Sequence, residues 1–184
     1  MKLGGFYSHR RNNGLAVIEF TIVATVLLLV LFGIMELARF VFSLQMLNEV
    51  TRKAARLASV CYVTEADTSK IPSSIVITSI APADYQPAML KIDYLDIDGQ
   101  TVDSSIFNSG ATVSQIDEEF VKIRFVRAKI ENFSFGFSLL SGLLGSVGTP
   151  SFETTVPAES LGIYRPIGES ETAPTGSTDC LSNV

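Results

Sequence analysis

The stretch LAVIEFTIVATVLLLVLFGIM, residues 15–35, decides the architecture of this 184-residue chain. Glu19 is its only charged residue. About 20 apolar residues, at about 1.5 Å of rise per helical residue, match the roughly 30 Å hydrocarbon core of a bilayer. The main alternative is a cleaved secretory signal, but such signals have a shorter apolar core, about 7–15 residues, followed by a small-residue cleavage site. We therefore expect a retained transmembrane helix over residues 15–37.

The same helix is expected to continue beyond the membrane as an amphipathic segment, residues 38–62. Gly33 is the only glycine between residues 15 and 97, and the first proline is Pro72, so helix breakers are absent. The apolar and small residues of one face recur at steps of three or four: Leu37, Val41, Leu44, Leu47, Ala54, Ala58 and Cys61. The whole helix would be about 70 Å long. Its first half would lie in lipid, and its second half would pack on the rest of the chain.

The remainder, residues 63–184, is predicted to form a β-rich domain. Strand-like patterns occur at residues 75–77, 90–94 and 121–125, and Asp98-Gly99 is typical of a two-residue hairpin turn. We interpret residues 133–148 as a loop or short helix, and residues 169–178 as an exposed tail. The predicted fold class is α+β, with a long N-terminal helix packed on an antiparallel sheet.

Several motifs surround the apolar stretch. The basic residues Lys2, Arg10 and Arg11 precede Gly14, and Glu19 and Phe20 are the fifth and sixth residues after it. Glu36 and Arg39 follow the stretch, and the basic, alanine-rich sequence TRKAARLAS occupies residues 51–59. On these motifs the N-terminal part of the chain resembles the TadE family, minor pilins of the tight-adherence (Flp) pilus.

This resemblance implies a pilin-like fold and a role in assembly. A prepilin peptidase would cut between Gly14 and Leu15, so residues 1–14 would be a cleaved leader. The expected partners are other minor and major pilins (TadF-like and Flp-like), the inner-membrane pilus assembly platform and membrane lipid. The chain would cross the bacterial inner membrane once, with a cytoplasmic N-terminus and a periplasmic domain, or stand in the extracellular pilus.

Glu19 needs a partner or a proton, because a charged, unpaired carboxylate in hydrocarbon costs about 2.5–3.5 kcal/mol. Cleavage after Gly14 would create a positive amine at Leu15, one helical turn away, and a helix N-terminus that favours a carboxylate. The resemblance implies that in a filament Glu19 pairs with the Leu15 amine of a neighbouring subunit and that Phe20 belongs to the same assembly surface. The alternative is that Glu19 reaches the headgroups at the end of the span.

At the other end of the span, Glu36 and Arg39 are three residues apart and are expected to neutralise one another at the membrane interface. Their role would be structural anchoring.

The two cysteines, Cys61 and Cys180, have neither metal-ligand nor CxxC spacing, which leaves a disulfide or two free thiols. The orientation implied by the resemblance places both in an oxidising compartment, where a bridge is expected. It would close a loop of more than 100 residues, worth about 4.7 kcal/mol in the chain-entropy model.

Enzyme chemistry is poorly supported, and no cofactor or metal is expected. The only histidine, His9, lies in the leader, and no glycine-rich phosphate loop occurs. Glu118 and Glu119 are adjacent, and on a strand they would face opposite ways. The net charge of −5 argues against nucleic acid as a partner. Two other functions stay open: a bitopic envelope accessory protein of a secretion system, and a pilus-tip adhesin.

Overall fold

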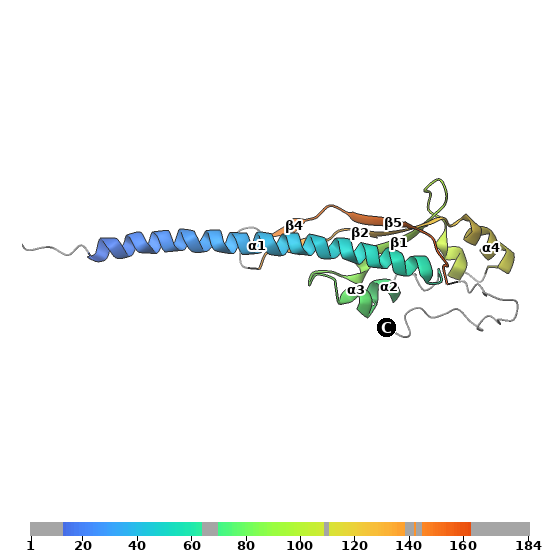
Figure 1. Ribbon diagram of the computed structural model, residues 1–184, viewed down its shortest axis with the longest axis horizontal. Coiled ribbons are helices and arrows are strands. Elements are labelled where there is room, and N and C mark those ends of the chain that lie inside the picture. Colours follow the sequence, from blue (N-terminus) through green and yellow to red (C-terminus); the bar gives the residue numbers. More distant parts are fainter. Residues whose placement is uncertain (1–12, 64–69, 109–110, 139–141, 143–144, 163–184) are drawn as a thin grey trace, which may run out of the picture.

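A computed structural model describes residues 13–63, 70–108, 111–138, 142 and 145–162. The dominant element is α1, a 48-residue helix over Asn13–Val60. At about 1.5 Å per residue it is about 72 Å long. Its N-terminal half extends away from the rest of the molecule, and its C-terminal half lies along a small β-rich domain (Figure 1). The predicted continuous helix and the α+β fold are confirmed.

The remaining elements are short. They follow α1 in this order: α2 (Lys70–Ser73), α3 (Ile75–Thr78), η1 (Pro87–Met89), β1 (Leu90–Leu95), η2 (Ser104–Asn108), α4 (Val113–Lys122), β2 (Phe125–Ile130), β3 (Ser134–Gly136), β4 (Ser146–Gly148) and β5 (Phe152–Pro157). The three strands β1, β2 and β5 form an antiparallel sheet with β2 in the centre, and β3 pairs with β4.

The hydrophobic core lies between one face of α1 and this sheet. Ala54, Ala55 and Ala58 are fully buried, so the helix backbone can approach the strands closely. The central strand contributes alternate residues of period two, Val126, Ala128 and Ile130, all buried. The hydroxyls of Thr51 on α1 and Thr154 on β5, 3.0 Å apart, satisfy each other across the contact.

The strands β2 to β5 form one long hairpin that runs along α1. Ile130 is paired with Phe152 and Ser134 with Gly148, and the backbone N–H of Thr149 donates to the carbonyl of Phe133 between them (3.0 Å). The pairing therefore continues from β2–β5 into β3–β4 without a register shift. About 13 residues per leg, at about 3.3 Å each, give a ribbon roughly 43 Å long.

The buried face of this hairpin changes at Asn132. Ile130 is buried at an even position, whereas Phe133 and Phe135 are buried at odd positions. Asn132 has a φ of +59°, a left-handed conformation that asparagine tolerates better than most residues. This residue twists the ribbon so that its far end also faces α1.

Two strands expected from the sequence are wrong. Residues 75–77 lie in the one-turn helix α3, where the Ser74 carbonyl accepts the backbone N–H groups of Ile77 and Thr78 (3.1 and 2.9 Å). Local bonds thus satisfy a backbone that has no neighbouring strand. Residues 121 and 122 end α4, and only Phe125 of the second run is in a strand.

The prediction that Glu118 and Glu119 lie on opposite faces of a strand is also wrong, because this segment is helical. Both lie on α4, where their carboxylates approach the Lys122 ammonium at 3.7 and 2.6 Å. They are the i,i+4 and i,i+3 partners of one lysine on an exposed helix.

A turn forms at Asp98-Gly99, but it is not the expected two-residue hairpin turn. The Asp96 N–H donates to the Gln100 carbonyl (2.9 Å), so three residues, 97–99, lie between the paired positions, and the second strand is not formed. Gly99 has a φ of +78°, and the Asp96 carboxylate accepts the backbone N–H groups of Asp98 and Gln100 (2.9 and 2.8 Å). Beyond the turn there is a single bridge between Leu95 and Thr101. The neighbour of β1 is β2 instead. Residues 133–148, expected to be a loop or short helix, contain β3 and β4, and the tail at residues 169–178 lies outside the described residues.

The central strand provides a test of this core. Val126→Ala should lower the free energy of unfolding by about 2–3 kcal/mol, because it removes two buried methyl groups and leaves a cavity. The matched change Val121→Ala, at a side chain that is 65% exposed, should alter it by less than about 0.5 kcal/mol. Urea unfolding of the full chain in detergent, followed by circular dichroism, measures both. Equal losses would contradict the packing described here.

Candidate functional site

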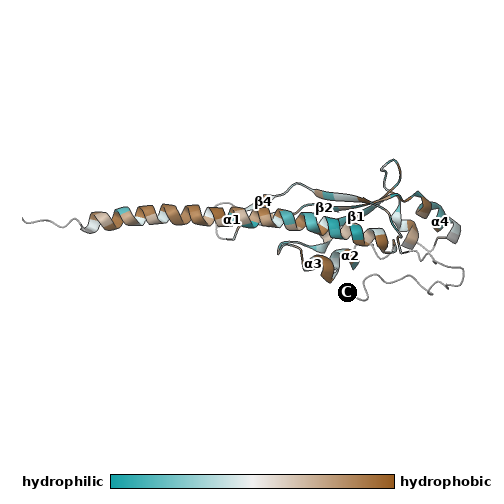
Figure 2. Cartoon of the chain, in the orientation of Figure 1, coloured by the Kyte–Doolittle hydropathy of each residue, from teal (hydrophilic) through white to brown (hydrophobic). Residues whose placement is uncertain are grey.

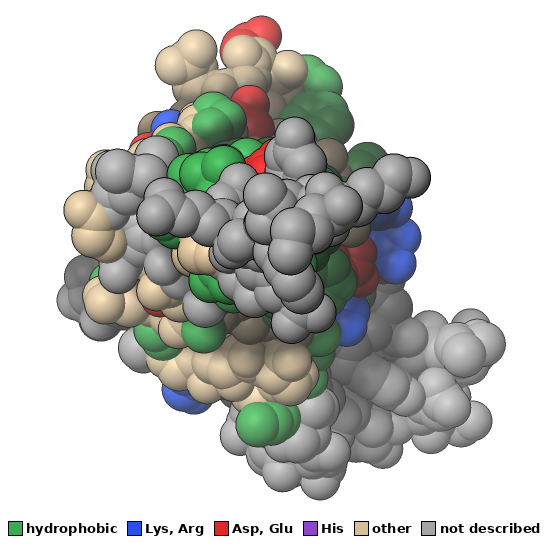
Figure 3. All heavy atoms as spheres, turned by 90° about the vertical axis from the view of Figure 1, so that its left-hand side faces the viewer, with side chains coloured by type: hydrophobic (Ala, Val, Ile, Leu, Met, Phe, Trp, Pro, Cys, Tyr) green, Lys and Arg blue, Asp and Glu red, His purple; other side chains and the backbone are tan. Residues whose placement is uncertain are grey.

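The N-terminal half of α1 is exposed on all sides. The most apolar 18-residue window of this helix has no buried residue, and its length and composition suit a membrane span. Hydrophobic colour predominates along this half of the helix, whereas hydrophilic residues are frequent on the half beside the sheet (Figure 2). Seen from the N-terminal side of the molecule, hydrophobic side chains are visible at many places on the surface, with Lys and Arg side chains scattered among them (Figure 3). These features are those of a single membrane anchor.

Glu19 is the one polar side chain of this half that no described residue satisfies. The hydroxyls of Thr21 and Thr25 donate to the carbonyls of Val17 and Thr21 one turn earlier, at 2.8 and 2.7 Å. The carboxylate of Glu19 is exposed and has no ion pair or hydrogen bond with any residue that the structure describes. Phe20 beside it is 74% exposed. An acid and an aromatic ring therefore stand together on an unpartnered helix surface.

Gly14 and Leu15, the predicted processing site, lie in the first turn of α1. Gly14 is exposed, and a Cβ placed on it would meet nothing within 4 Å. Because glycine in a helix costs about 1 kcal/mol relative to alanine and the first turn lacks partners for its N–H groups, this end unwinds easily. Gly14 and Leu15 are both exposed at this end of the helix, and their role as a processing site stays a prediction.

A buried carboxylate, that of Glu36, lies at the opposite end of the exposed half of α1. Glu36 is 1% exposed and forms an ion pair with Arg39 (Oε2 to Nη1, 3.0 Å). Its Oε1 accepts the backbone N–H and the hydroxyl of Ser138, at 3.2 and 3.1 Å. Arg39 also donates to the Ser138 hydroxyl. We call Glu36, Arg39 and Ser138 the junction cluster.

Aromatic rings surround the junction cluster. The guanidinium of Arg39 lies 5.6 Å from the ring centre of Phe135, a favourable cation–π distance. Phe40 and Phe135 meet edge to face with centres 5.4 Å apart, and Phe137 packs on Phe135 in the same way. The far end of the hairpin is therefore fixed to α1 by charge and by apolar contact together.

The sequence suggested the pairing of Glu36 with Arg39 but not the participation of Ser138. Ser138 is 102 residues away from Glu36, and nothing in its neighbourhood marks it as a ligand of a carboxylate. The environment of the pair also differs from the expected one at the membrane interface, because the hairpin covers the Glu36 side chain on the surface of α1.

The C-terminal end of α1 is tied to the chain that follows β5. The Ser59 carbonyl accepts the backbone N–H groups of Glu159 and Leu161, at 3.2 and 3.1 Å. A Cβ on Gly162 would lie 2.5 Å from the backbone nitrogen of Tyr62, so only glycine allows this approach. Cys61 is fully buried beside them. Its predicted partner Cys180 lies outside the described residues, so the bridge stays a prediction.

These elements define a class: an α+β protein of pilin-like arrangement, in which a long apolar helix carries a small antiparallel sheet on its C-terminal half. A family model described as TadE-like protein matches residues 14–56, so this part of the chain is similar to that family. The match includes Gly14, Glu19, Phe20, Glu36 and Arg39, and it confirms the resemblance inferred from the sequence. No match was found among curated proteins or solved structures.

The junction cluster can be tested at Ser138. Ser138→Ala removes one hydrogen bond to a buried carboxylate and should weaken local stability by about 1.5 kcal/mol. The exchange of the Phe137 amide hydrogen, which bonds to the Gly145 carbonyl (3.3 Å), should then be about tenfold faster. Ser146→Ala, at an exposed position on β4, is the control and should leave this rate unchanged. An unchanged rate in Ser138→Ala would show that the hydroxyl does not hold the hairpin.

Proposed function

We propose that this chain is a minor pilin of the tight-adherence (Flp) pilus that takes part in pilus assembly. The supporting observation is the exposed apolar half of α1, which presents a single unpaired carboxylate, Glu19, and is joined rigidly to a folded domain. The TadE-like match over this helix supports the same conclusion. Such a chain assembles rather than catalyses, since TadE-like proteins belong to a pilin-like family.

In this proposal α1 anchors the chain in the bacterial inner membrane, with Gly14 on the cytoplasmic side and the sheet in the periplasm. A prepilin peptidase cuts between Gly14 and Leu15, and the assembly platform then transfers the mature chain among TadF-like and Flp-like pilins. The junction cluster stands at the outer end of the span, where Glu36 and Arg39 keep the charge of the chain neutral close to lipid.

Glu19 gives this assembly its direction. When a neighbouring chain offers its cleaved N-terminal amine at Leu15, the two opposite charges neutralise each other in a medium of low dielectric constant. Removing either member would leave the other buried and unpaired, which is strongly unfavourable. Pairing between chains therefore favours one axial register over sliding of the apolar helices. Phe20 packs beside the pair.

The pairing role predicts a specific defect. Glu19→Ala should insert in the membrane normally, because the substitution makes the span more apolar, but the protein should be lost from sheared pili. Glu49→Ala, which removes an exposed acid from the same helix outside the span, should be incorporated like the unmodified chain. Immunoblots of membrane and pilus fractions compare the two. Normal incorporation of Glu19→Ala would refute the pairing, and absence of the unmodified protein from pili would favour an envelope accessory protein.

Processing is tested separately at Gly14. Gly14→Ala should leave unprocessed precursor in the membrane, because the added methyl group sits next to the bond that the peptidase must fit. Gly33→Ala, in the same helix and equally free of close neighbours, should be processed normally. N-terminal sequencing of the extracted proteins should read Leu15 first in the unmodified chain and in Gly33→Ala. A mature-sized Gly14→Ala would remove the peptidase from the proposal.

A further inference from the structure

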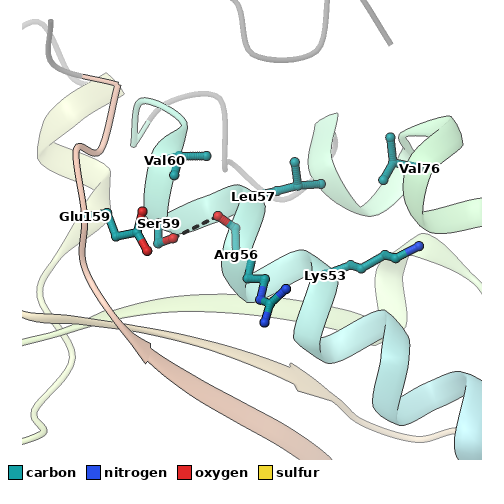
Figure 4. A pocket seen from close by; sticks show the side chains of 7 residues that line it. All are labelled: Lys53, Arg56, Leu57, Ser59, Val60, Val76 and Glu159. Atoms are coloured by element: carbon teal, nitrogen blue, oxygen red, sulfur yellow. Dashed lines mark hydrogen bonds between the residues drawn. The ribbon is translucent and has the colours of Figure 1, made fainter.

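A groove of about 570 Å³ lies on the outward face of α1, near its C-terminal end. It is lined by Lys53, Arg56, Leu57, Ser59 and Val60 of α1, by Val76 of α3 and by Glu159 after β5. Figure 4 shows Lys53 extending toward the side of Val76, whereas Glu159 lies at the opposite end beside Ser59. The groove is remote from the membrane half of α1 and plays no part in the assembly surface proposed above.

The groove combines an apolar floor with cations. Leu57 and Val76 are half-buried and Val60 is 37% exposed, so the floor is only partly covered by described residues. Neither Lys53 nor Arg56 forms an ion pair with any described residue, although Glu49 lies one turn from Lys53. An extended segment with carboxylates at its Lys53 end would complement this surface.

We propose that the occupant is the chain's own C-terminal segment, residues 163–184, with Glu169 and Glu171 beside Lys53 and Arg56. This segment contains three acids, Glu169, Glu171 and Asp179, against one base, Arg165. The last described residue before it, Gly162, lies against Tyr62 at the end of α1, so the segment leaves the domain next to the groove.

The length of the segment suits a path along the groove and back. Lys53 lies about nine residues before Tyr62 on the helix, a distance of roughly 14 Å at about 1.5 Å per residue. Seven residues, from Gly162 to Glu169, span up to about 23 Å when extended, which is enough to reach Lys53. The nine residues from Glu171 to Cys180 then allow a return to Cys61, the predicted disulfide partner.

An acidic surface of a second copy would be a weaker occupant. The best candidate, α4, carries Glu118 and Glu119, but Lys122 already neutralises part of their charge at 3.7 and 2.6 Å. The tethered segment also meets the groove at an effective concentration of the order of millimolar, without loss of translational freedom.

The test is a zero-length carbodiimide cross-link in the full chain, purified in detergent. The reagent joins a carboxylate and an amine in contact as an amide, taking up the water that is lost. Mass spectrometry of the monomer band should show Lys53 linked to Glu169 or Glu171. Lys91, an exposed lysine on β1, is the control and should not be linked to these residues. The measurement does not involve pili, so its failure would leave the proposed function untouched.

A second readout uses Glu169→Gln together with Glu171→Gln. The acetylation rate of Lys53 should rise about two- to fivefold in this variant, as expected for loss of an exposed ion pair, while that of Lys91 stays constant. Absence of the Lys53 cross-link, or its presence only between two chains, would overturn the proposal. An unchanged acetylation rate would also overturn it.

Discussion

The structure of this molecule depends on one constraint: a single helix must suit lipid in its first half and a protein–water boundary in its second half. The first half of α1 is apolar on every side, whereas the second half must bury one face on protein and leave the other in water. The transition occurs at Glu36, whose carboxylate is buried yet receives bonds from Ser138 and Arg39. A buried carboxylate is destabilising by several kcal/mol unless it is paired and hydrogen-bonded. The hairpin therefore has to reach this point of the helix, because Ser138 supplies the donors that α1 itself does not.

The long hairpin then attaches the domain along the whole extramembrane half of the helix. It is held near the helix end by the Ser59 carbonyl, in the middle by Thr51 and Thr154, and at the junction by Glu36. From residue 36 to residue 59 the helix is about 35 Å long, comparable to the roughly 43 Å ribbon once its twist is allowed for. The β-rich domain is thus attached to the helix at three points along this length rather than at one end.

Elements that depend on local sequence periodicity could be predicted from the sequence, whereas elements that depend on tertiary contacts could not. The helix, the strand at Leu90–Leu95 and the Asp98-Gly99 turn follow from local patterns. Residues 75–77 read as a strand because β-branched residues dominate, but without a neighbouring strand their backbone closes a helical turn. The hairpin through residues 133–148 is rich in Gly and Ser, which weakens any strand signal, and the register comes from its pairing partner. Ser138 carries no local signal at all.

Glu19 and Glu36 show how differently the chain treats its two ends of the span. They are about 17 residues apart, or roughly 26 Å along the helix, close to the thickness of the hydrocarbon. Glu36 is satisfied within the fold, so folding alone stabilises it. Glu19 has no partner among the described residues, and the Thr21 and Thr25 hydroxyls are already bonded to the helix backbone. The described part of the fold leaves this acid unsatisfied, so in the proposed function the free energy of pairing it is available to a later step, processing and association with another chain.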